Sequence, residues 1–212
     1  MAFSATTRSW IARTRLLAVA LTAASALACR PTPDTFIQLV VDSSDAAVIA
    51  ETERVLLKRF DDEYPGVVEA KTEGSVITVA FRHTTPDREL VHALYAMPGR
   101  LRATIPDLGA ILFTTRDIAD ANIAYREKEY MLRIKLVPAA KQRIQRLTTQ
   151  AVGNIAQLEV DGHVWVRATI SSPMSDSMQV PLPGATEVDA RALSIVLRSG
   201  AHLPAQVSQR AS

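Results

Sequence analysis

The side chains that could do chemistry are few and lie far apart in the sequence. None of the four histidines has a second His or Cys at metal-ligand spacing: His83, His92, His163 and His202. The sequence also lacks G-x-S-x-G, H-E-x-x-H and a Gly-rich phosphate loop. These patterns favour structural or surface roles for the histidines.

Two acidic groups could hold a metal ion or form an acid–base pair. They are residues 61–63, with the sequence Asp-Asp-Glu, and the pair Asp117 and Asp120. Short acidic clusters at helix ends are typical of solvated surface. We therefore expect that the protein is not an enzyme and that it binds no metal and no cofactor. The alternative, a hydrolase, would require a bound metal or a deep pocket around His163 or Asp117.

Charge and composition exclude other classes of function. The 212 residues are 48% hydrophobic and 5% aromatic, which indicates a globular chain with a core and few rings for stacking bases. Three of the 24 basic residues lie in residues 1–28, so the remainder has 21 basic and 22 acidic residues. A body so close to neutral has no electrostatic footprint for nucleic acid.

The N-terminal segment predicts export. Residues 1–15 are basic, residues 16–28 are apolar and small, and Ala26-Leu27-Ala28 fits the small-x-small pattern of signal cleavage. The apolar run has 13 residues, whereas a membrane span needs about 20. No later segment approaches that length. Residues 1–28 are therefore predicted to be a signal peptide.

Cys29, the single cysteine, follows the expected cleavage point directly. It has no partner for an internal disulfide, and "ALAC" resembles the lipobox of bacterial lipoproteins. We expect Cys29 to carry a lipid and residues 29–35 to form a tether to either membrane of the envelope. Ordinary signal cleavage at the same bond, leaving a free N-terminal Cys, is the alternative.

Hydrophobic periodicity predicts a strand–helix–strand–strand–helix–strand order in the first half. The expected strands are 36–42, 67–70, 76–81 and 101–105, and the helices begin after residues 45 and 87. This order is typical of a ferredoxin-like split βαβ unit.

The second half alternates in the same way. We expect strands at 110–113, 130–137, 155–160, 163–170 and 178–182, and helices at 118–121, 138–152 and 187–198. Asp161-Gly162 is a strong hairpin signal, and Thr186 begins a capping box for the last helix. The fold class is therefore predicted to be α+β, with two small subdomains and mainly antiparallel sheets.

The stretch Tyr125–Tyr130, "YREKEY", mixes rings and charges. Either these charges protect a solvated strand edge from aggregation, or the edge pairs with an extended polypeptide. The sequence leaves both interpretations open.

The last hundred residues resemble the first periplasmic domain of SecD, a subunit of the SecD–SecF export complex. The similarity lies in Val152-Gly153, Asp161-Gly162, "VWVRATI", Pro173-Met174, Gln179-Val180 and "TEVDARALSIVLRSGAHLPA". "VLLKRF", "SVITVAF" and "ILFTTRDIADA" match the family more loosely, so the resemblance spans about 36–207. The chain departs from the family at the inserted His202 and at Ser175-Asp176-Ser177, which replaces a Gly-rich turn.

The resemblance implies a base-type ferredoxin-like subdomain at 36–108, a head-like subdomain at 109–207 and a tail at 208–212. It further implies a periplasmic binding module that contacts unfolded or emerging polypeptide or Sec translocon subunits. The membrane helices that follow this domain in SecD are not found here, so we expect no proton-driven motor. The alternative is an envelope structural or assembly protein that kept the fold and lost the export role.

We expect the polypeptide contact in the loop before the last predicted strand. Its residues are Ser171, Ser172, Pro173, Met174, Ser175, Asp176 and Ser177.

Overall fold

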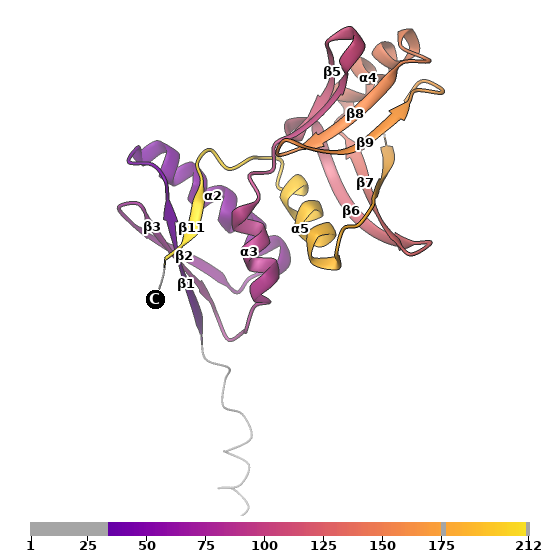
Figure 1. Cartoon of the computed structure of the whole chain (residues 1–212). Helices are drawn as coiled ribbons and strands as arrows, with labels where there is room; N and C mark the ends of the chain where they lie inside the picture. The colour runs from indigo at the N-terminus through magenta and orange to yellow at the C-terminus, as the bar shows by residue number, and fades with distance from the viewer. Residues whose placement is uncertain (1–33, 175–176, 211–212) are drawn as a thin grey trace, which may run out of the picture. The chain divides into compact units, whose positions relative to one another are not determined.

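The computed structural model describes residues 34–174 and 177–210 (Figure 1). The helices of this part are α2 (Ala46–Glu63), α3 (Arg88–Ala96), α4 (Pro138–Gln150) and α5 (Glu187–Arg198), with 3₁₀ turns η1 (Pro106–Leu108) and η2 (Thr115–Asp117). The strands are β1 (Thr35–Val41), β2 (Val68–Glu73), β3 (Val76–Phe81), β4 (Leu101–Ile105), β5 (Ala110–Thr114), β6 (Ile118–Arg126), β7 (Glu129–Leu136), β8 (Ile155–Val160), β9 (His163–Thr169), β10 (Ser177–Leu182) and β11 (Val207–Gln209).

These strands form three antiparallel sheets within the described residues, so the predicted α+β class is confirmed. None of the described helices is long and apolar enough to cross a bilayer. The predicted signal peptide, residues 1–28, and Cys29 lie outside the described residues.

The first sheet has the strand order β11-β1-β3-β2, and we call it, with α2 and α3, the base. Helices α2 and α3 cover the face that carries Leu39 and Ile77, and Phe60 meets Phe81 edge to face at 5.6 Å between ring centroids. This is the arrangement expected for a split βαβ unit, with one exception. The place beside β1 belongs to β11, whose Val207 pairs with Val41, and not to β4.

Strand β4 was expected to complete the base but joins another sheet, between β5 and β8. Pro98 and Gly99 follow α3, and Leu101, Ala103 and Ile105 then bury their side chains in a different core. In the strand pairing, the change from one sheet to the next falls between α3 and β4, whereas the predicted boundary lies after residue 108. The base is built from two segments, and the chain between them forms the second half.

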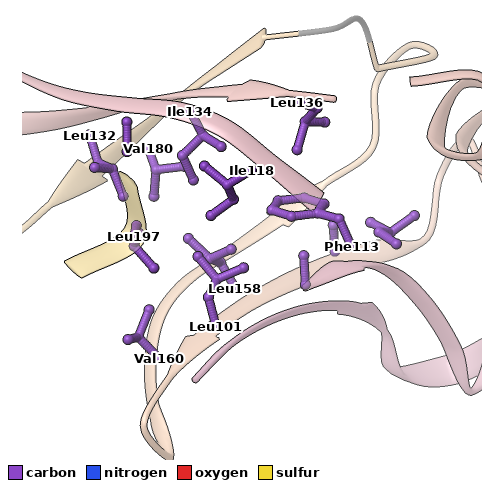
Figure 2. Packing of buried hydrophobic residues seen from close by; sticks show 14 of the residues in the cluster. Leu101, Phe113, Ile118, Leu132, Ile134, Leu136, Leu158, Val160, Val180 and Leu197 are labelled. Carbon is purple, nitrogen blue, oxygen red and sulfur yellow. The ribbon is translucent and has the colours of Figure 1, made fainter. Parts of the chain in front are cut away.

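The second half, which we call the head, contains two sheets with the orders β10-β7-β6 and β5-β4-β8-β9. Leu132, Ile134 and Leu136 on β7 point toward Phe113 and Leu158 of the other sheet (Figure 2). Alternation along each strand places one face of each sheet in this shared core and leaves the other to solvent.

Residues 118–121 were expected to form a short helix, and this prediction is wrong. The capping box between Thr114 and Asp117 exists, but it closes only the 3₁₀ turn η2. Strand β6 then begins at Ile118 and pairs along β7 as far as Arg126. Ladder hydrogen bonds over nine residues, together with the burial of Ile118 and Ala121, outweigh the tendency of four residues to form one helical turn.

Helix α5 packs against both cores. Ala190, Leu193 and Leu197 belong to the head core, and Ile195 and Val196 belong to the base core. Thr186 and Asp189 form the expected capping box, and Gly200 has a φ of 70° after the helix end. Because its apolar residues surround most of the helix, α5 is buried on two sides.

Arg59 on α2 binds both segments that connect the base and the head, which we call the crossings: the outgoing segment after α3 and the returning segment after α5. Its side chain is fully buried, and its guanidinium donates hydrogen bonds to the carbonyl oxygens of Leu94, Met97, Pro98 and Ala201 at 2.6–3.3 Å. Burial lowers the pKa of Arg59 to about 10, so the group stays charged at neutral pH. A single cation thus satisfies backbone groups of both the outgoing and the returning chain.

Candidate functional site

An apolar cleft opens between the two sheets of the head and has a volume of about 120 Å³. Its walls are almost entirely aliphatic, aromatic or thioether side chains. The lining residues are Ala103, Leu112, Phe113, Ala156, Gln157, Leu158, Val166, Ala168, Met174, Met178, Gln179 and Val180.

The cleft exists because β9 and β10 are both terminal strands of their sheets. They approach each other, but no ladder of backbone hydrogen bonds joins them within the described residues. Pro181 in β10 has no N–H to donate, as is common in edge strands. The cleft therefore lies on the side of the head where these two strands meet without pairing.

Met174 and Met178 lie at the cleft and are half-buried. Methionine has three rotatable bonds and a polarizable sulfur, so it adapts to apolar partners of different shape. The two thioethers suit a site that accepts varied hydrophobic side chains.

The predicted contact loop begins beside this cleft. Ser171, Ser172 and Pro173 are exposed, and Ser177 is the first residue of β10. Ser175 and Asp176 lie outside the described residues.

Met174 is held where the loop reaches α4. Its backbone N–H donates to the hydroxyl of Thr148 at 2.9 Å, and that hydroxyl donates to the carbonyl of Ile144 at 2.8 Å. Thr148 is fully buried, so this contact fixes one end of the loop against the helix.

The structure does not bring the histidines together into a metal site. No group of three His, Cys, Asp or Glu side chains within residues 34–174 and 177–210 is placed to hold a metal ion. His163 is the first residue of β9, and its ring packs edge to face against the Trp165 ring, with 4.9 Å between the ring centroids.

The acidic groups singled out in the sequence serve structural contacts. Asp62 and Glu63 pair with Arg198 and Arg191, which ties α2 to α5. The carboxylate of Asp61 accepts the backbone N–H of Gly66 at 2.9 Å.

Asp117 joins the turn η2 to α4. Its carboxylate contacts the Arg143 guanidinium at 2.8 Å and accepts the backbone N–H of Thr114 at 2.9 Å. Burial acts to raise the pKa of Asp117, but the hydrogen bonds from Arg143 and Thr114 together hold the pKa below its ordinary value. Asp117 is thus a charged anchor for the turn.

Tyr125 and Tyr130 pair across the hairpin between β6 and β7, with ring centroids 4.9 Å apart. Glu127 and Lys128 have positive φ angles of 51° and 70° and form the turn. The stretch "YREKEY" is therefore a hairpin end, and β6 is an edge strand as both interpretations assumed.

Residues 105–205 match the family model described as "SecDF, P1 head subdomain". This segment resembles the P1 head subdomain of SecDF. A search of curated protein sequences gives no match.

Two solved SecDF structures show the same fold. One, from work on "a membrane component SecDF that enhances protein export", has a TM-score of 0.65 and 15% identity, over 84% of this chain and 99% of that one. The other, SecDF in a "Super-membrane-facing form", has a TM-score of 0.68 and 16% identity over 93% of this chain. This chain covers 35% of the length of that second protein.

The segment that matches the family model begins at the last residue of β4 and ends after α5, so it contains the expected contact loop and nearly the whole wall of the apolar cleft. Sequence reasoning found Met174 but missed Met178, Val166 and the residues of β5 and β8. The recurrence of Met at 174 and 178, on both sides of a polar loop, is the one sequence signal that could have indicated an apolar site. The remaining walls come from strands that only the sheet pairing brings together.

Proposed function

We propose that this protein is an exported, lipid-anchored periplasmic module that binds unfolded or emerging polypeptide, or a translocon subunit, during protein export. The apolar cleft with its two methionines supports the proposal most directly. SecDF, whose P1 head subdomain resembles residues 105–205, is described as a membrane component that enhances protein export, which agrees with such a role. Cys29 is the proposed point of lipid attachment.

The volume of the cleft limits how large a part of a ligand can enter it. An apolar cavity of roughly 150 Å³ in a protein core accommodates benzene. A cleft of about 120 Å³ therefore suits one hydrophobic side chain of a longer partner. An extended chain offers such side chains only while it is unfolded.

A binding assay tests the cleft. We expect a fluorescent peptide carrying Leu and Phe in a polar sequence to bind the full-length chain, and the Met174→Ser/Met178→Ser double variant to bind it about tenfold more weakly. Met131→Ser is the matched control, because Met131 lies on β7 outside the cleft. Equal affinity of all three proteins would remove the cleft from the proposal.

Photocrosslinking in cells tests the partner. A photoreactive residue at the exposed position 172 is expected to capture exported chains or translocon subunits, whereas one at the exposed position 71 on β2 is not. Capture of unrelated envelope proteins alone would favour the assembly role. Absence of any capture at position 172 would contradict polypeptide handling.

Fractionation tests the anchor separately. Lipid attachment at Cys29 predicts that Cys29→Ala moves the protein from the membrane fraction to the soluble periplasm. Simple signal cleavage predicts no difference between the variant and the natural protein.

A further inference from the structure

A second and larger cleft, of about 690 Å³, lies where the first strand of the head leaves the base. Its walls come from the start of β4, the end of β5, the β8–β9 turn and the returning chain. The lining residues are Pro98, Arg100, Leu101, Arg102, Thr114, Thr115, Arg116, Glu159, Asp161, Gly162 and His202. This cleft shares no residue with the apolar cleft.

Three arginines line this cleft: Arg100, Arg102 and Arg116. All three side chains are exposed, and none forms an ion pair within the described part of the chain. Arg102 lies opposite Glu159 in the β4–β8 register, yet no ion pair joins them. The cleft therefore holds guanidinium groups that protein carboxylates leave available.

The other acid of the cleft is already engaged. The two carboxylate oxygens of Asp161 accept the backbone N–H groups of Gly99 and Arg100 at 2.9 and 2.7 Å. The hydroxyl of Thr115 likewise accepts the N–H of Leu101 and donates to the carbonyl of Gly99. These contacts shape the walls of the cleft, in which three arginines outnumber the two acids Glu159 and Asp161.

We propose that this cleft binds an acidic segment of polypeptide, with Asp or Glu side chains paired to Arg100, Arg102 and Arg116. Arginine presents a fork of N–H donors that matches the two oxygens of a carboxylate. The three arginines come from the start of β4 and from the turn η2 and line a cleft large enough for a multi-residue ligand, so several carboxylates on one chain fit better than a single small anion. The lining contains no Phe, Tyr or Trp on which a nucleic acid base could stack.

The proposal rests on the proposed function only for the class of ligand, because a polypeptide-handling module meets acidic as well as apolar segments. Such a segment would touch both crossings between base and head, since Arg100 and His202 belong to the outgoing and the returning chain. The apolar and acidic parts of one polypeptide would occupy different clefts.

The test uses fluorescein-labelled hexaglutamate and the full-length chain at low salt, where exposed charges are least screened. We expect binding that the Arg102→Gln/Arg116→Gln variant weakens about tenfold. Arg126→Gln/Arg133→Gln is the matched control, because it removes the same charge from exposed positions on β6 and β7. Hexaglutamine should not bind.

Three results would overturn the proposal. They are equal weakening in both double variants, equal binding of hexaglutamine, and displacement of the probe by inorganic phosphate as effectively as by unlabelled hexaglutamate at equal charge. The Leu- and Phe-containing peptide is measured in parallel and should bind the Arg102→Gln/Arg116→Gln variant normally. If the natural chain binds hexaglutamate but not the Leu- and Phe-containing peptide, the proposed function is contradicted and the acidic site stands.

Discussion

The sheets of the base and of the head differ in how their edge strands are placed. In the base, β11 completes the sheet beside β1, and a buried guanidinium satisfies the carbonyls at its junction with the head. In the head, β9 and β10 end two sheets that face each other, and an apolar cleft remains between them. The difference shows that the apolar cleft of the head arises where two edge strands face each other without pairing.

The largest effect should come from removing the buried cation of the junction. Arg59→Met keeps much of the volume but removes the guanidinium donor from four carbonyl oxygens. The oxygens of Pro98 and Ala201 keep a second donor, whereas those of Leu94 and Met97 lose a charged hydrogen bond in a buried place, so we expect a loss of about 4 kcal/mol in the free energy of unfolding. Urea denaturation measures this loss. Arg54→Met on the same helix is the control, because Arg54 is exposed and forms a surface ion pair with Glu51; its change should stay within about 0.5 kcal/mol. Similar losses in both variants would show that the buried hydrogen bonds of Arg59 stabilise the fold no more than an exposed ion pair does.

A smaller effect is expected from crowding the same junction. A Cβ on Gly99 would lie 2.4 Å from Cγ1 of Val196 and 2.8 Å from the Arg59 guanidinium, and its φ of 86° suits glycine. We expect Gly99→Ala to lower the unfolding free energy by about 3 kcal/mol.

Gly66→Ala separates the two causes. Gly66 has a φ of 73° with no atom near its Cβ position, so this variant should lose only about 1 kcal/mol. If the two alanine variants lose the same free energy in thermal or urea unfolding, backbone strain alone explains both and the close packing of the junction is refuted.

The smallest effect should come from an anchor of the head. Asp117→Asn removes a half-exposed ion pair with Arg143, so we expect a loss of about 1 kcal/mol at pH 7. The native fold lowers the pKa of Asp117, so the stabilisation is present above the ordinary value of 3.8 and disappears as the pH falls through the lower folded pKa.

Unfolding curves of the natural chain and of Asp117→Asn should therefore differ at pH 7 and converge below pH 3.8. Asp107→Asn, at an exposed position in η1, should show no difference at either pH. A difference between the natural chain and Asp117→Asn that persists undiminished in acid would assign the effect to something other than the carboxylate charge.

Local signals predicted much of this fold. The capping box at Thr186 fixed the start of α5, and Asp161-Gly162 marked the β8–β9 hairpin, because both depend on residues within four positions of each other. The capping box at Thr114 wrongly predicted a helix at residues 118–121, because pairing with β7 makes this segment a strand. Of the residues that line the apolar cleft, the predicted contact loop included Met174 alone, and the opposite wall was not predicted.

The sequence by itself determined the α+β class, most strands and helices, and the resemblance to SecD, since periodicity, caps and turns are properties of neighbouring residues. Only the tertiary structure decided that β11 rather than β4 completes the base and that Arg59 binds both segments that connect base and head. It also decided that two clefts of different chemistry arise, one within the head and one where the head joins the base. Each of these features depends on segments far apart in the chain, as when Val207 pairs with Val41. Strand edges and buried carbonyls accept any partner of suitable geometry, so the choice among partners is made only when the whole core packs.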